Sequence, residues 1–200
     1  MSSSANIFGL LHRAGMGLAS RGRNIYYRTL GVKITGYVWM RHIEIGRNWS
    51  DIYLEKGVSL DQGVVFVTGG SPKSGKISIR SGTYVNRYTI FDGHESIEIG
   101  RRCMIGPHCY ITDGDHSKEP GLPVQAQPMR TAAVILEDEV WVGSHVVILP
   151  GVRIGRGAVI GAASVVTRNI PANAIAYGVP AKVARMRGEP SKAGMQEVLP

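Results

Sequence analysis

The stretch LEDEVWVGSHVVILPGVRIGRGAVIGAASVVTRNI, residues 136–170, repeats a pattern every six positions. An aliphatic residue opens each hexad, and a small or β-branched residue stands four positions later. The aliphatic positions are Leu136, Val142, Ile148, Ile154, Ile160 and Val166, and the second positions are Val140, Val146, Val152, Ala158, Ser164 and Ile170. A period of six matches neither an α-helix nor an alternating strand. It predicts a prism of short strands with a turn at every corner, which is the parallel β-helix.

Glycine follows the aliphatic residue at Gly143, Gly155 and Gly161, where a tight corner favours a residue without a side chain. The rhythm also extends backward with interruptions. Earlier aliphatic positions are Leu54, Leu60, Ile79, Val85, Ile99 and Ile105, with Val58, Val64, Thr83, Thr89, Cys103 and Cys109 in the second slots, and Ile34 and Val38 as a first hexad. Three hexads make one coil, so about six coils stack at the ~4.8 Å spacing of neighbouring strands.

These hexads predict one all-β domain over residues 34–178, since 200 residues suffice for a single sizeable core. Each coil contacts only its neighbours, so both ends need caps. We expect a helical arm over residues 1–33 at one end and a short cap helix with a tail over residues 179–200 at the other. Cys103 and Cys109 fill core slots, so we interpret them as small buried residues, with a disulfide or metal role as the alternative.

The formal net charge of +8 predicts an anionic partner. Nucleic acid is not favoured, because the basic residues form no run and the core matches no nucleic-acid-binding module. A phosphate-rich cofactor and a lipid surface fit their positions better. Many of them lie at the two ends of the chain, as Arg13, Arg21, Arg23, Arg28, Lys33, Lys182, Arg185, Arg187 and Lys192.

The N-terminal segment has an apolar helical face of Ile7, Leu10, Leu11, Ala14 and Leu18. Charged and polar residues interrupt it, so it is not typical of a signal peptide, and no stretch reaches the ~18 apolar residues of a membrane span. One interpretation is an arm that caps the first coil. The other is a basic amphipathic helix on an anionic bilayer. The second predicts a cytoplasmic protein that associates peripherally with the inner membrane face.

Two segments interrupt the hexads. Residues 69–76 are rich in Gly, Ser and Lys, which predicts a solvated loop. Their glycines and lysine lack the spacing of a Walker phosphate-binding loop. Residues 112–134 form a longer loop, and long loops on rigid scaffolds commonly carry function. This loop opens with Asp113, Asp115 and His116. An imidazole can take a proton from a hydroxyl near neutral pH, so His116 is the candidate general base, with an ordinary loop histidine as the alternative. No histidine pair has metal-site spacing, so no metal is expected.

The segment over residues 140–185 resembles the hexapeptide-repeat acetyltransferases, which include galactoside and maltose O-acetyltransferases and the sugar O-acetyltransferases of surface-polysaccharide synthesis. It reads VWVGSHVVILPGVRIGRGAVIGAASVVTRNIPANAIAYGVPAKVAR, and the VWVG, PGV, VVTRNIP and GVPAKV motifs carry the match. The resemblance extends over about residues 79–186. It implies a left-handed β-helix, an exception to the usual crossover hand. It also implies a homotrimer with active sites between subunits.

The resemblance implies roles for single residues as well. His116 matches the general base of the family. The positions that match residues binding acetyl-CoA are Trp141, Ser144, Ala162, Thr167, Arg168, Lys182 and Arg185. Arg168 replaces a lysine of the family, which keeps the charge but changes its geometry. Asn86 and Asp92 lie in VNRYTIFDG, which resembles the acceptor-side stretch in an imperfect register, and Asp115 is grouped with them.

The chemistry agrees with these roles. Acyl transfer from a thioester needs a base for the acceptor oxygen and a donor for the developing oxyanion. His116 supplies the first and a backbone amide near Ser144 the second. Asp113 or Asp115 is a candidate to orient His116, with a solvated loop carboxylate as the favoured interpretation of each. Because both cysteines are assigned to the core, we expect direct transfer without an acyl-enzyme. The prediction is an acetyl-CoA-dependent O-acetyltransferase for a sugar or glycan hydroxyl. The alternatives are another small acceptor, such as an antibiotic or amino sugar, and a non-enzymatic β-helix scaffold.

Overall fold

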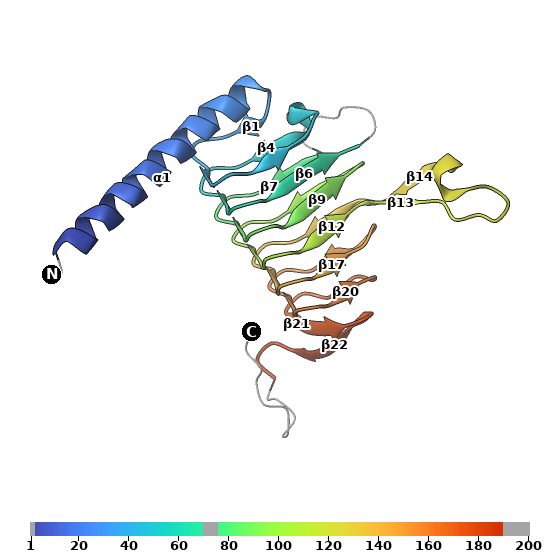
Figure 1. Cartoon of the computed structure of the whole chain (residues 1–200). Helices are drawn as coiled ribbons and strands as arrows, with labels where there is room; N and C mark the ends of the chain where they lie inside the picture. Colours follow the sequence, from blue (N-terminus) through green and yellow to red (C-terminus); the bar gives the residue numbers. More distant parts are fainter. Residues whose placement is uncertain (1–2, 70–75, 190–200) are drawn as a thin grey trace.

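The computed structural model describes residues 3–69 and 76–189. The chain forms a three-sided prism of short strands, with a long helix at one end and a hairpin projecting from its side (Figure 1). The helix α1 spans Ser3–Thr29, and two short 3-10 helices span Trp49–Asp51 (η1) and Val124–Ala126 (η2). The loop expected at residues 69–76 lies mostly outside the described residues.

Three sheets make the three sides of the prism. Sheet A contains β1 (Lys33–Ile34), β4 (Ile52–Leu54), β7 (Ile77–Ile79), β10 (Ile97–Ile99), β15 (Val134–Leu136) and β18 (Arg153–Ile154). Sheet B contains β2 (Trp39–Met40), β5 (Ser59–Leu60), β8 (Tyr84–Val85), β11 (Met104–Ile105), β16 (Trp141–Val142), β19 (Val159–Ile160), β21 (Ala174–Gly178) and β22 (Ala181–Met186). Sheet C contains β3 (Glu44–Ile45), β6 (Val65–Thr68), β9 (Ile90–Gly93), β12 (Tyr110–Thr112), β17 (Val147–Ile148) and β20 (Val165–Val166). The strands run A, B, C along the chain, so six coils are stacked in parallel, as the hexads predict.

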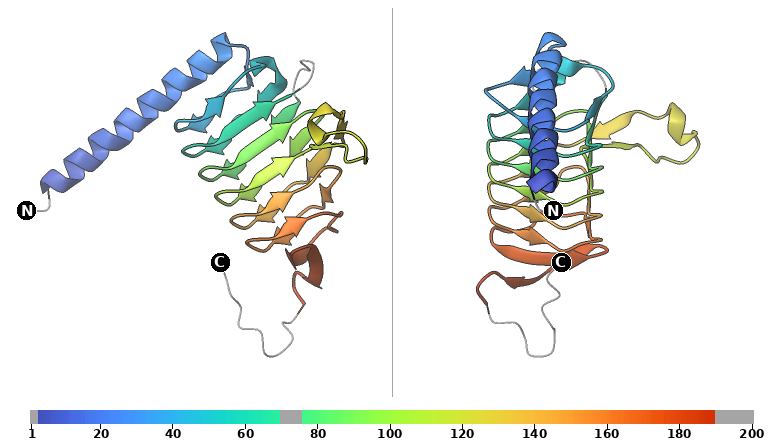
Figure 2. Two further views of the ribbon diagram at one scale, coloured as in Figure 1. Left: turned by 45° about the vertical axis from the view of Figure 1, so that its right-hand side comes forward. Right: turned by 60° about the vertical axis from the view of Figure 1, so that its left-hand side comes forward.

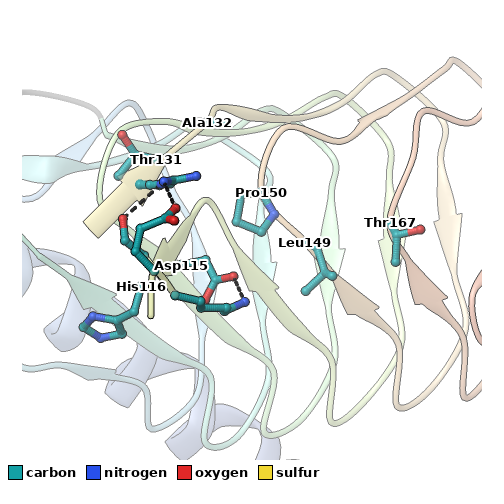
Figure 3. Close-up of a pocket in the computed structure, with 11 residues that line it drawn as sticks. Asp115, His116, Thr131, Ala132, Leu149, Pro150 and Thr167 are labelled. Atoms are coloured by element: carbon teal, nitrogen blue, oxygen red, sulfur yellow. Dashed lines mark hydrogen bonds and ion pairs between the residues drawn. The ribbon is translucent and has the colours of Figure 1, made fainter. Parts of the chain in front are cut away.

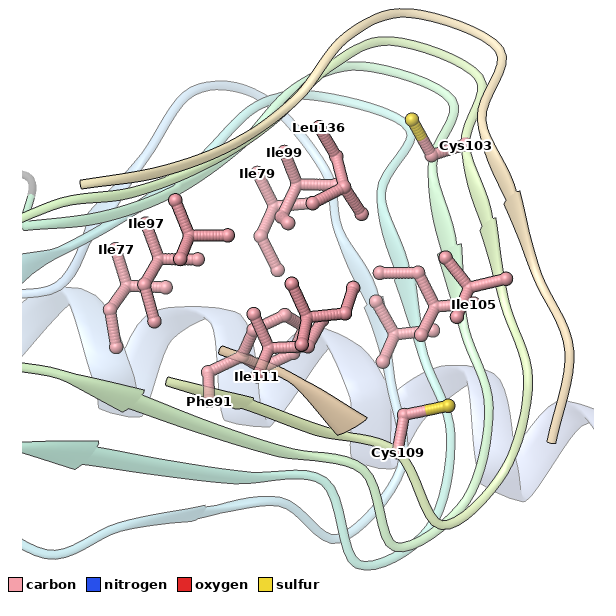
Figure 4. Close-up of a cluster of buried hydrophobic side chains, with 14 of the residues drawn as sticks. Ile77, Ile79, Phe91, Ile97, Ile99, Cys103, Ile105, Cys109, Ile111 and Leu136 are labelled. Carbon is pink, nitrogen blue, oxygen red and sulfur yellow. The ribbon is translucent and has the colours of Figure 1, made fainter. Parts of the chain in front are cut away.

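The core follows the hexad positions. All twelve predicted positions between Leu136 and Ile170 are buried, none with more than 4% of its surface exposed. Equivalent residues of successive coils lie over one another, as Ile79, Ile99 and Leu136 do in Figure 4. Each buried aliphatic side chain contributes about 1.5–3 kcal/mol of hydrophobic stabilisation. The column of repeated small contributions therefore holds the prism together.

The glycine corners are also confirmed. A β-carbon on Gly143 would lie 2.7 Å from the backbone nitrogen of Ala162, and one on Gly155 would lie 2.4 Å from that of Ala172. Such distances are too short for any side chain, so these corners require glycine. Cys103 and Cys109 are buried free thiols near two corners, as predicted, and each Sγ lies 3.1 Å from a backbone carbonyl oxygen of the next coil.

The two ends of the prism are closed differently from each other. At the first coil, the C-terminal half of α1 docks through polar contacts, and Asn24 bonds the backbone of Val38 in both directions. The N-terminal half of α1 extends away from the coils (Figure 2). Leu10, Leu11 and Leu18 are each at least 63% exposed there, whereas the side chain of Ile7 lies outside the described residues. The arm therefore both caps the first coil and leaves an apolar face uncovered.

The cap helix expected at the C-terminus is wrong for residues 181–186. These residues form β22, which pairs antiparallel with β21 as a hairpin on the last coil. The exposed edge of the final coil supplies backbone hydrogen-bonding groups to this segment, and a strand can use them whereas a helix cannot. The remaining part of that expectation, residues 190–200, lies outside the described residues. None of the described helices is long and apolar enough to cross a membrane.

Candidate active site

The long inserted loop leaves the prism where sheet C passes to sheet A. This edge, which we call the C–A corner, also carries the turns after β17 and β20, with Leu149, Pro150 and Thr167. The loop forms a two-stranded hairpin of β13 (Gly114–His116) and β14 (Met129–Thr131). It projects well beyond the prism (Figure 1). The candidate base His116 is therefore held on a strand outside the coils.

Asp113 anchors the base of this hairpin. Its carboxylate is fully buried and accepts hydrogen bonds from the backbone nitrogens of His94 at 2.7 Å, Glu95 at 2.9 Å and Ser96 at 2.6 Å. Both oxygens are thus used to hold the turn of the preceding coil. The hypothesis that Asp113 orients His116 is wrong, because both oxygens of its carboxylate accept hydrogen bonds from the backbone of residues 94–96.

The tip of the hairpin is held by its own polar contacts. The Gln127 side chain donates to the carbonyl oxygens of Glu119 and Leu122, both at 2.9 Å, and accepts from the Glu119 nitrogen at 2.8 Å. Arg130 bonds the Ser117 hydroxyl at 3.0 Å and pairs with the Glu119 carboxylate at 2.7 Å. These contacts tie the two strands and the intervening segment into one defined unit.

The two faces of the hairpin differ. Cross-strand pairs alternate between faces, so Asp115 and Arg130 share one face while His116 and Met129 share the other. A groove of about 410 Å³ lies between the hairpin and the C–A corner. It is lined by Asp115, His116, Ser117, Lys118, Glu119, Arg130, Thr131, Ala132, Leu149, Pro150 and Thr167. The ring of His116 points away from Leu149 and Thr167 (Figure 3).

Asp115 is paired with a neighbour on its own side of the hairpin. It forms an ion pair with Lys118, and this contact holds the pKa of the Asp115 carboxyl below its usual range. The carboxylate is therefore ionised at neutral pH and engaged beside the groove. Within residues 3–69 and 76–189, no hydrogen bond joins it to the His116 ring, so the structure gives no support to the second candidate for orienting the base.

The residues matched to cofactor binding fall into separate groups. Trp141 lies on β16 of sheet B, and Ser144 and Ala162 lie in the turns where sheet B passes to sheet C, which we call the B–C corner. Thr167 and Arg168 lie at the C–A corner, with the hairpin of His116. Lys182 and Arg185 stand on β22 beyond the last coil. One chain therefore brings His116 near Thr167 but not to the B–C corner.

The residues matched to acceptor binding also lie apart from one another. Asn86 lies in the B–C turn of the third coil, where its side-chain oxygen accepts from the Arg87 nitrogen at 2.8 Å. Asp92 lies on the outer face of β9 in sheet C. Its carboxylate accepts a hydrogen bond from the Tyr110 hydroxyl at 2.6 Å and lies 3.2 Å from the Nε2 of His94, and the sequence interpretation assigned neither residue to the site. The sequence signal for His94 was its place two residues after Asp92, and the repeat gives none for Tyr110. Within the described part of the chain, no group of three or more side chains is arranged to hold a metal ion.

Comparison with known proteins fits this arrangement. Residues 133–168 match the model of the bacterial transferase hexapeptide (six repeats). A protein of Escherichia coli K12, named for an O-acetyl transferase activity in lipopolysaccharide biosynthesis (WbbJ), is 32% identical over 153 residues, which are 70% of this chain and 78% of that protein. The chain belongs to the hexapeptide-repeat transferase family, and its fold is the left-handed β-helix of that family.

Two further proteins extend the comparison. The galactoside O-acetyltransferase of Escherichia coli K12 is 39% identical over 110 residues, which are 54% of this chain and 53% of that protein. The solved structure of a mutant of the N-acyltransferase AntD from Bacillus cereus, in complex with dTDP and coenzyme A, superposes with a TM-score of 0.64. It is 25% identical and covers 78% of this chain and 83% of its own.

Proposed function

We propose that this protein transfers the acetyl group of acetyl-CoA to a hydroxyl group of a sugar or glycan intermediate, in the biosynthesis of a surface polysaccharide. The observation that carries the proposal is His116, placed on a defined hairpin at the same corner as Thr167. Family membership and the O-acetyltransferase relatives support the reaction class. The acceptor class rests on the names of those relatives and on the polar residues beside His116.

In the proposed reaction, His116 accepts the proton of the acceptor hydroxyl as its oxygen attacks the thioester carbonyl. A backbone amide at Ser144 donates a hydrogen bond to the developing oxyanion. The carbon–sulfur bond then breaks, and the proton on His116 passes to the departing sulfur. The products are an acetyl ester and the free thiol of coenzyme A, so the base returns to its starting state.

A cysteine acyl-enzyme does not fit the structure. Burial raises the pKa of the Cys103 and Cys109 thiols to about 11 each, so almost none of either thiol is ionised near pH 7. The thiolate is the nucleophilic form of cysteine. Both side chains also lie inside the prism, which leaves no path for a substrate.

The phosphates of coenzyme A would meet the basic end of the molecule. Arg168 at the C–A corner and Lys182 on β22 are exposed, and Arg185 on β22 is half-buried. No acidic residue in the described part of the chain forms an ion pair with Arg168. Thr167 lines the groove at the C–A corner, on the same edge of the prism as the hairpin of His116. These residues fit an extended polyanionic ligand.

We propose a homotrimer, because the site residues of one chain lie at different corners. A neighbour could bring its B–C corner, with Trp141 and Ser144, to the hairpin of His116. The outward faces of the sheets support such contacts. Sheet C presents Val65, Ile90, Tyr110, Val147 and Val165 outward together with Glu44 and Asp92, and sheet B presents Trp39, Tyr84, Met104, Trp141, Val159 and Ile175, whereas sheet A presents Lys33, Glu98 and Arg153 together with Tyr53 and Ile135. Sheets B and C are therefore the more apolar sides, which suits a closed ring in which two sides are covered.

We also propose that α1 holds the enzyme at an anionic membrane surface, in the cytoplasm at the inner membrane face. The face of α1 opposite Ser20 and Asn24 carries Leu11, Leu18 and Ile25, all exposed. No acidic residue precedes Glu44, while Arg13, Arg21 and Arg28 lie on the exposed surface of the helix. Apolar insertion and several cations, each worth about 1 kcal/mol near an anionic surface, would act together.

The test of the reaction is acetyl transfer by the purified protein. Thiol release from acetyl-CoA is measured with a panel of methyl glycosides and amino sugars, for the wild type and His116→Ala. We expect turnover to fall by roughly 10²-fold or more, the usual effect of losing a general base, with coenzyme A affinity unchanged by calorimetry. His42→Ala, an exposed histidine of the first coil, is the matched control. Near-normal turnover in His116→Ala would refute the assignment of the base.

A further inference from the structure

Three arginines gather around one carboxylate at the first-coil end of the B–C corner. Arg41, Asp61 and Arg87 lie in the B–C turns of the first, second and third coils. The Oδ1 of Asp61 lies 3.2 Å from a terminal nitrogen of Arg41, and its Oδ2 lies 3.3 Å from the Nε of Arg87. Arg23 of α1 donates to the carbonyl oxygen of Met40, the residue before Arg41, at 3.4 Å. We call Arg23, Arg41 and Arg87 around Asp61 the arginine cluster.

Asp61 orients the two arginines that contact it. It also accepts hydrogen bonds from the backbone nitrogen of Gln62 at 2.7 Å and from the hydroxyl of Tyr84 at 3.2 Å. Burial by itself would raise the pKa of Asp61, but the hydrogen bonds from Gln62, Arg41, Arg87 and Tyr84 outweigh it and hold this pKa below its usual range. The carboxylate is therefore ionised at neutral pH, and both of its oxygens are engaged within the chain.

The arginines retain donors that the chain does not use. A guanidinium carries five N–H groups. Arg87 places its Nε on Asp61, and neither of its terminal nitrogens forms a hydrogen bond within residues 3–69 and 76–189. Arg41 directs its second terminal nitrogen at the Sδ of Met16, which is a weak acceptor, at 3.7 Å. The side chains of Arg41 and Arg87 are 36% and 55% exposed. Both guanidiniums are thus fixed on one side and open to solvent on the other.

The balance of charge distinguishes this cluster from ordinary surface ion pairs. In the turns where sheet A passes to sheet B, separate arginines have separate carboxylates, as Arg80 has Glu55, Arg102 has Glu139 and Arg156 has Asp138. Arg41 and Arg87 instead share Asp61, which leaves positive charge uncompensated. Oriented guanidiniums with unused donors and surplus charge match the oxygens of a phosphate group.

The cluster lies on the same corner as the proposed oxyanion donor. Arg87 stands in the third coil and Ser144 in the fifth, so two strand spacings, about 10 Å, separate their turns. One hexose with its linking oxygens is comparable in length with this separation. The residues proposed for the coenzyme A phosphates, Arg168, Lys182 and Arg185, lie at the opposite end of the prism. The cofactor therefore does not account for the arginine cluster.

We propose that Arg41 and Arg87 bind a phosphate group that the acceptor carries on its sugar, and that Asp61 is the positioning residue for both guanidiniums. The inference deepens the proposed function and rests on it. Arg23 adds positive charge beside the site. The acceptor class is then a sugar linked to phosphate. Sugars on a nucleoside diphosphate and sugars on a lipid diphosphate share this group.

The site is tested first by binding. Inorganic pyrophosphate is titrated by calorimetry into protein saturated with coenzyme A, so that the cofactor's own phosphate contacts are occupied. Arg41→Gln with Arg87→Gln should lower the affinity by about 10-fold or more, because it removes two charged donors. Arg80→Gln is the matched control, since Arg80 is similarly exposed and pairs with Glu55. Equal affinity of the wild type and the double variant would overturn the site.

The role of Asp61 has its own readout. Asp61→Asn removes a negative charge, so a purely electrostatic role predicts tighter binding of pyrophosphate. A positioning role predicts weaker binding, because the two guanidiniums lose the charged group that fixes them. We expect the affinity to fall by about 3-fold or more. Unchanged or tighter binding in Asp61→Asn would overturn the positioning role.

The acceptor class is tested by kinetics, with thiol release from acetyl-CoA as the readout. The acceptors are methyl hexopyranosides, the matching hexose 1-phosphates, UDP-hexoses and a short prenyl diphosphate-linked hexose. The wild type should use the phosphorylated acceptors with a kcat/KM about 10-fold or more above that of the methyl glycosides. In Arg87→Gln this ratio should fall toward one, whereas Arg80→Gln should retain it. A preference between the UDP and prenyl forms supports the site and identifies the carrier.

Two outcomes separate this inference from the proposed function. A wild-type protein that acetylates methyl glycosides as efficiently as phosphorylated sugars would overturn the phosphate assignment and leave the transferase activity standing. A wild-type protein that transfers acetyl groups from acetyl-CoA to none of these acceptors would refute the proposed function, and this inference with it.

Discussion

The carboxylate of Asp113 accepts a 2.6 Å hydrogen bond from the backbone nitrogen of Ser96, across the boundary between two coils. The same carboxylate holds His94 and Glu95. One buried side chain thus joins the turn of the third sheet-C strand to the base of the hairpin that carries His116. The position of the candidate base depends on this contact.

Asp113→Ala should therefore destabilise the fold and disturb the hairpin. The substitution leaves three backbone N–H groups without their acceptor, and each buried unpaired group costs about 1–3 kcal/mol. We expect a loss of at least about 2 kcal/mol in urea denaturation. Asp115→Ala, at an exposed carboxylate two residues away, should change stability by less than about 1 kcal/mol. Equal stability of the two variants would contradict the anchoring role.

Removal of Arg168 and Arg185 together should weaken coenzyme A binding. Charge-assisted hydrogen bonds to phosphate typically contribute about 1–3 kcal/mol, so we expect a loss in that range by calorimetry. The matched control is Arg153→Ala with Arg156→Ala, two arginines of the sheet A side that pair with Glu137 and Asp138. If both double variants bind coenzyme A like the wild type, the assigned phosphate contacts are wrong.

Light scattering should give the mass of three chains at micromolar concentration. Val147→Lys places a charge on the outer face of sheet C and should dissociate the trimer, because a buried unpaired charge is costly. Ile135→Lys makes the same change on the outer face of sheet A and should leave the trimer intact. A monomer mass for the wild type would refute the assembly, and equal behaviour of the two variants would refute the choice of sheets.

The membrane proposal is tested by co-sedimentation with vesicles. The wild type should pellet with phosphatidylglycerol vesicles at low salt and stay in solution with phosphatidylcholine vesicles. Leu11→Glu with Leu18→Glu should abolish pelleting, because both residues lie on the exposed face of α1. Leu122→Glu, an equally exposed leucine of the hairpin, is the control. A wild-type protein that stays in the supernatant with anionic vesicles would leave α1 as a cap alone.

The buried thiols give a pH-dependent prediction. Burial raises the pKa of Cys103 and Cys109 to about 11 from an ordinary value of 9.0. A raised pKa means that the unfolded thiols ionise first, so the stabilisation is complete below about pH 9 and is lost as pH rises toward 11. The urea midpoint should fall over this interval in the wild type and less in Cys103→Ala with Cys109→Ala. Near neutral pH, native thiols should react with Ellman's reagent far more slowly than denatured ones.

Much of the fold was predictable from the sequence because a β-helix is built from short-range repetition. Each hexad specifies its own inward residue and corner, so Leu136 through Val166 could be assigned to the core without knowing what lies above them. The glycines and cysteines followed from the same slots. The place of His116 on an inserted loop was also predictable, because a break in the repeat marks the insertion, whereas its role as the general base stays a prediction. The homotrimer and the cofactor residues stay predictions.

What the tertiary structure alone decided depends on contacts between coils. The link of Asp92 to Tyr110 joins residues 18 positions apart, and neither Tyr110 nor His94 is marked by the repeat. Residues 181–186 form a strand because the last coil has an open edge with unpaired backbone groups. Local sequence propensity does not predict such a pairing. Asp113 was assigned to a solvated loop, yet the preceding coil buries it. The sequence determined the repeating unit, since its pattern is local, whereas stacking decided which polar groups of different coils meet.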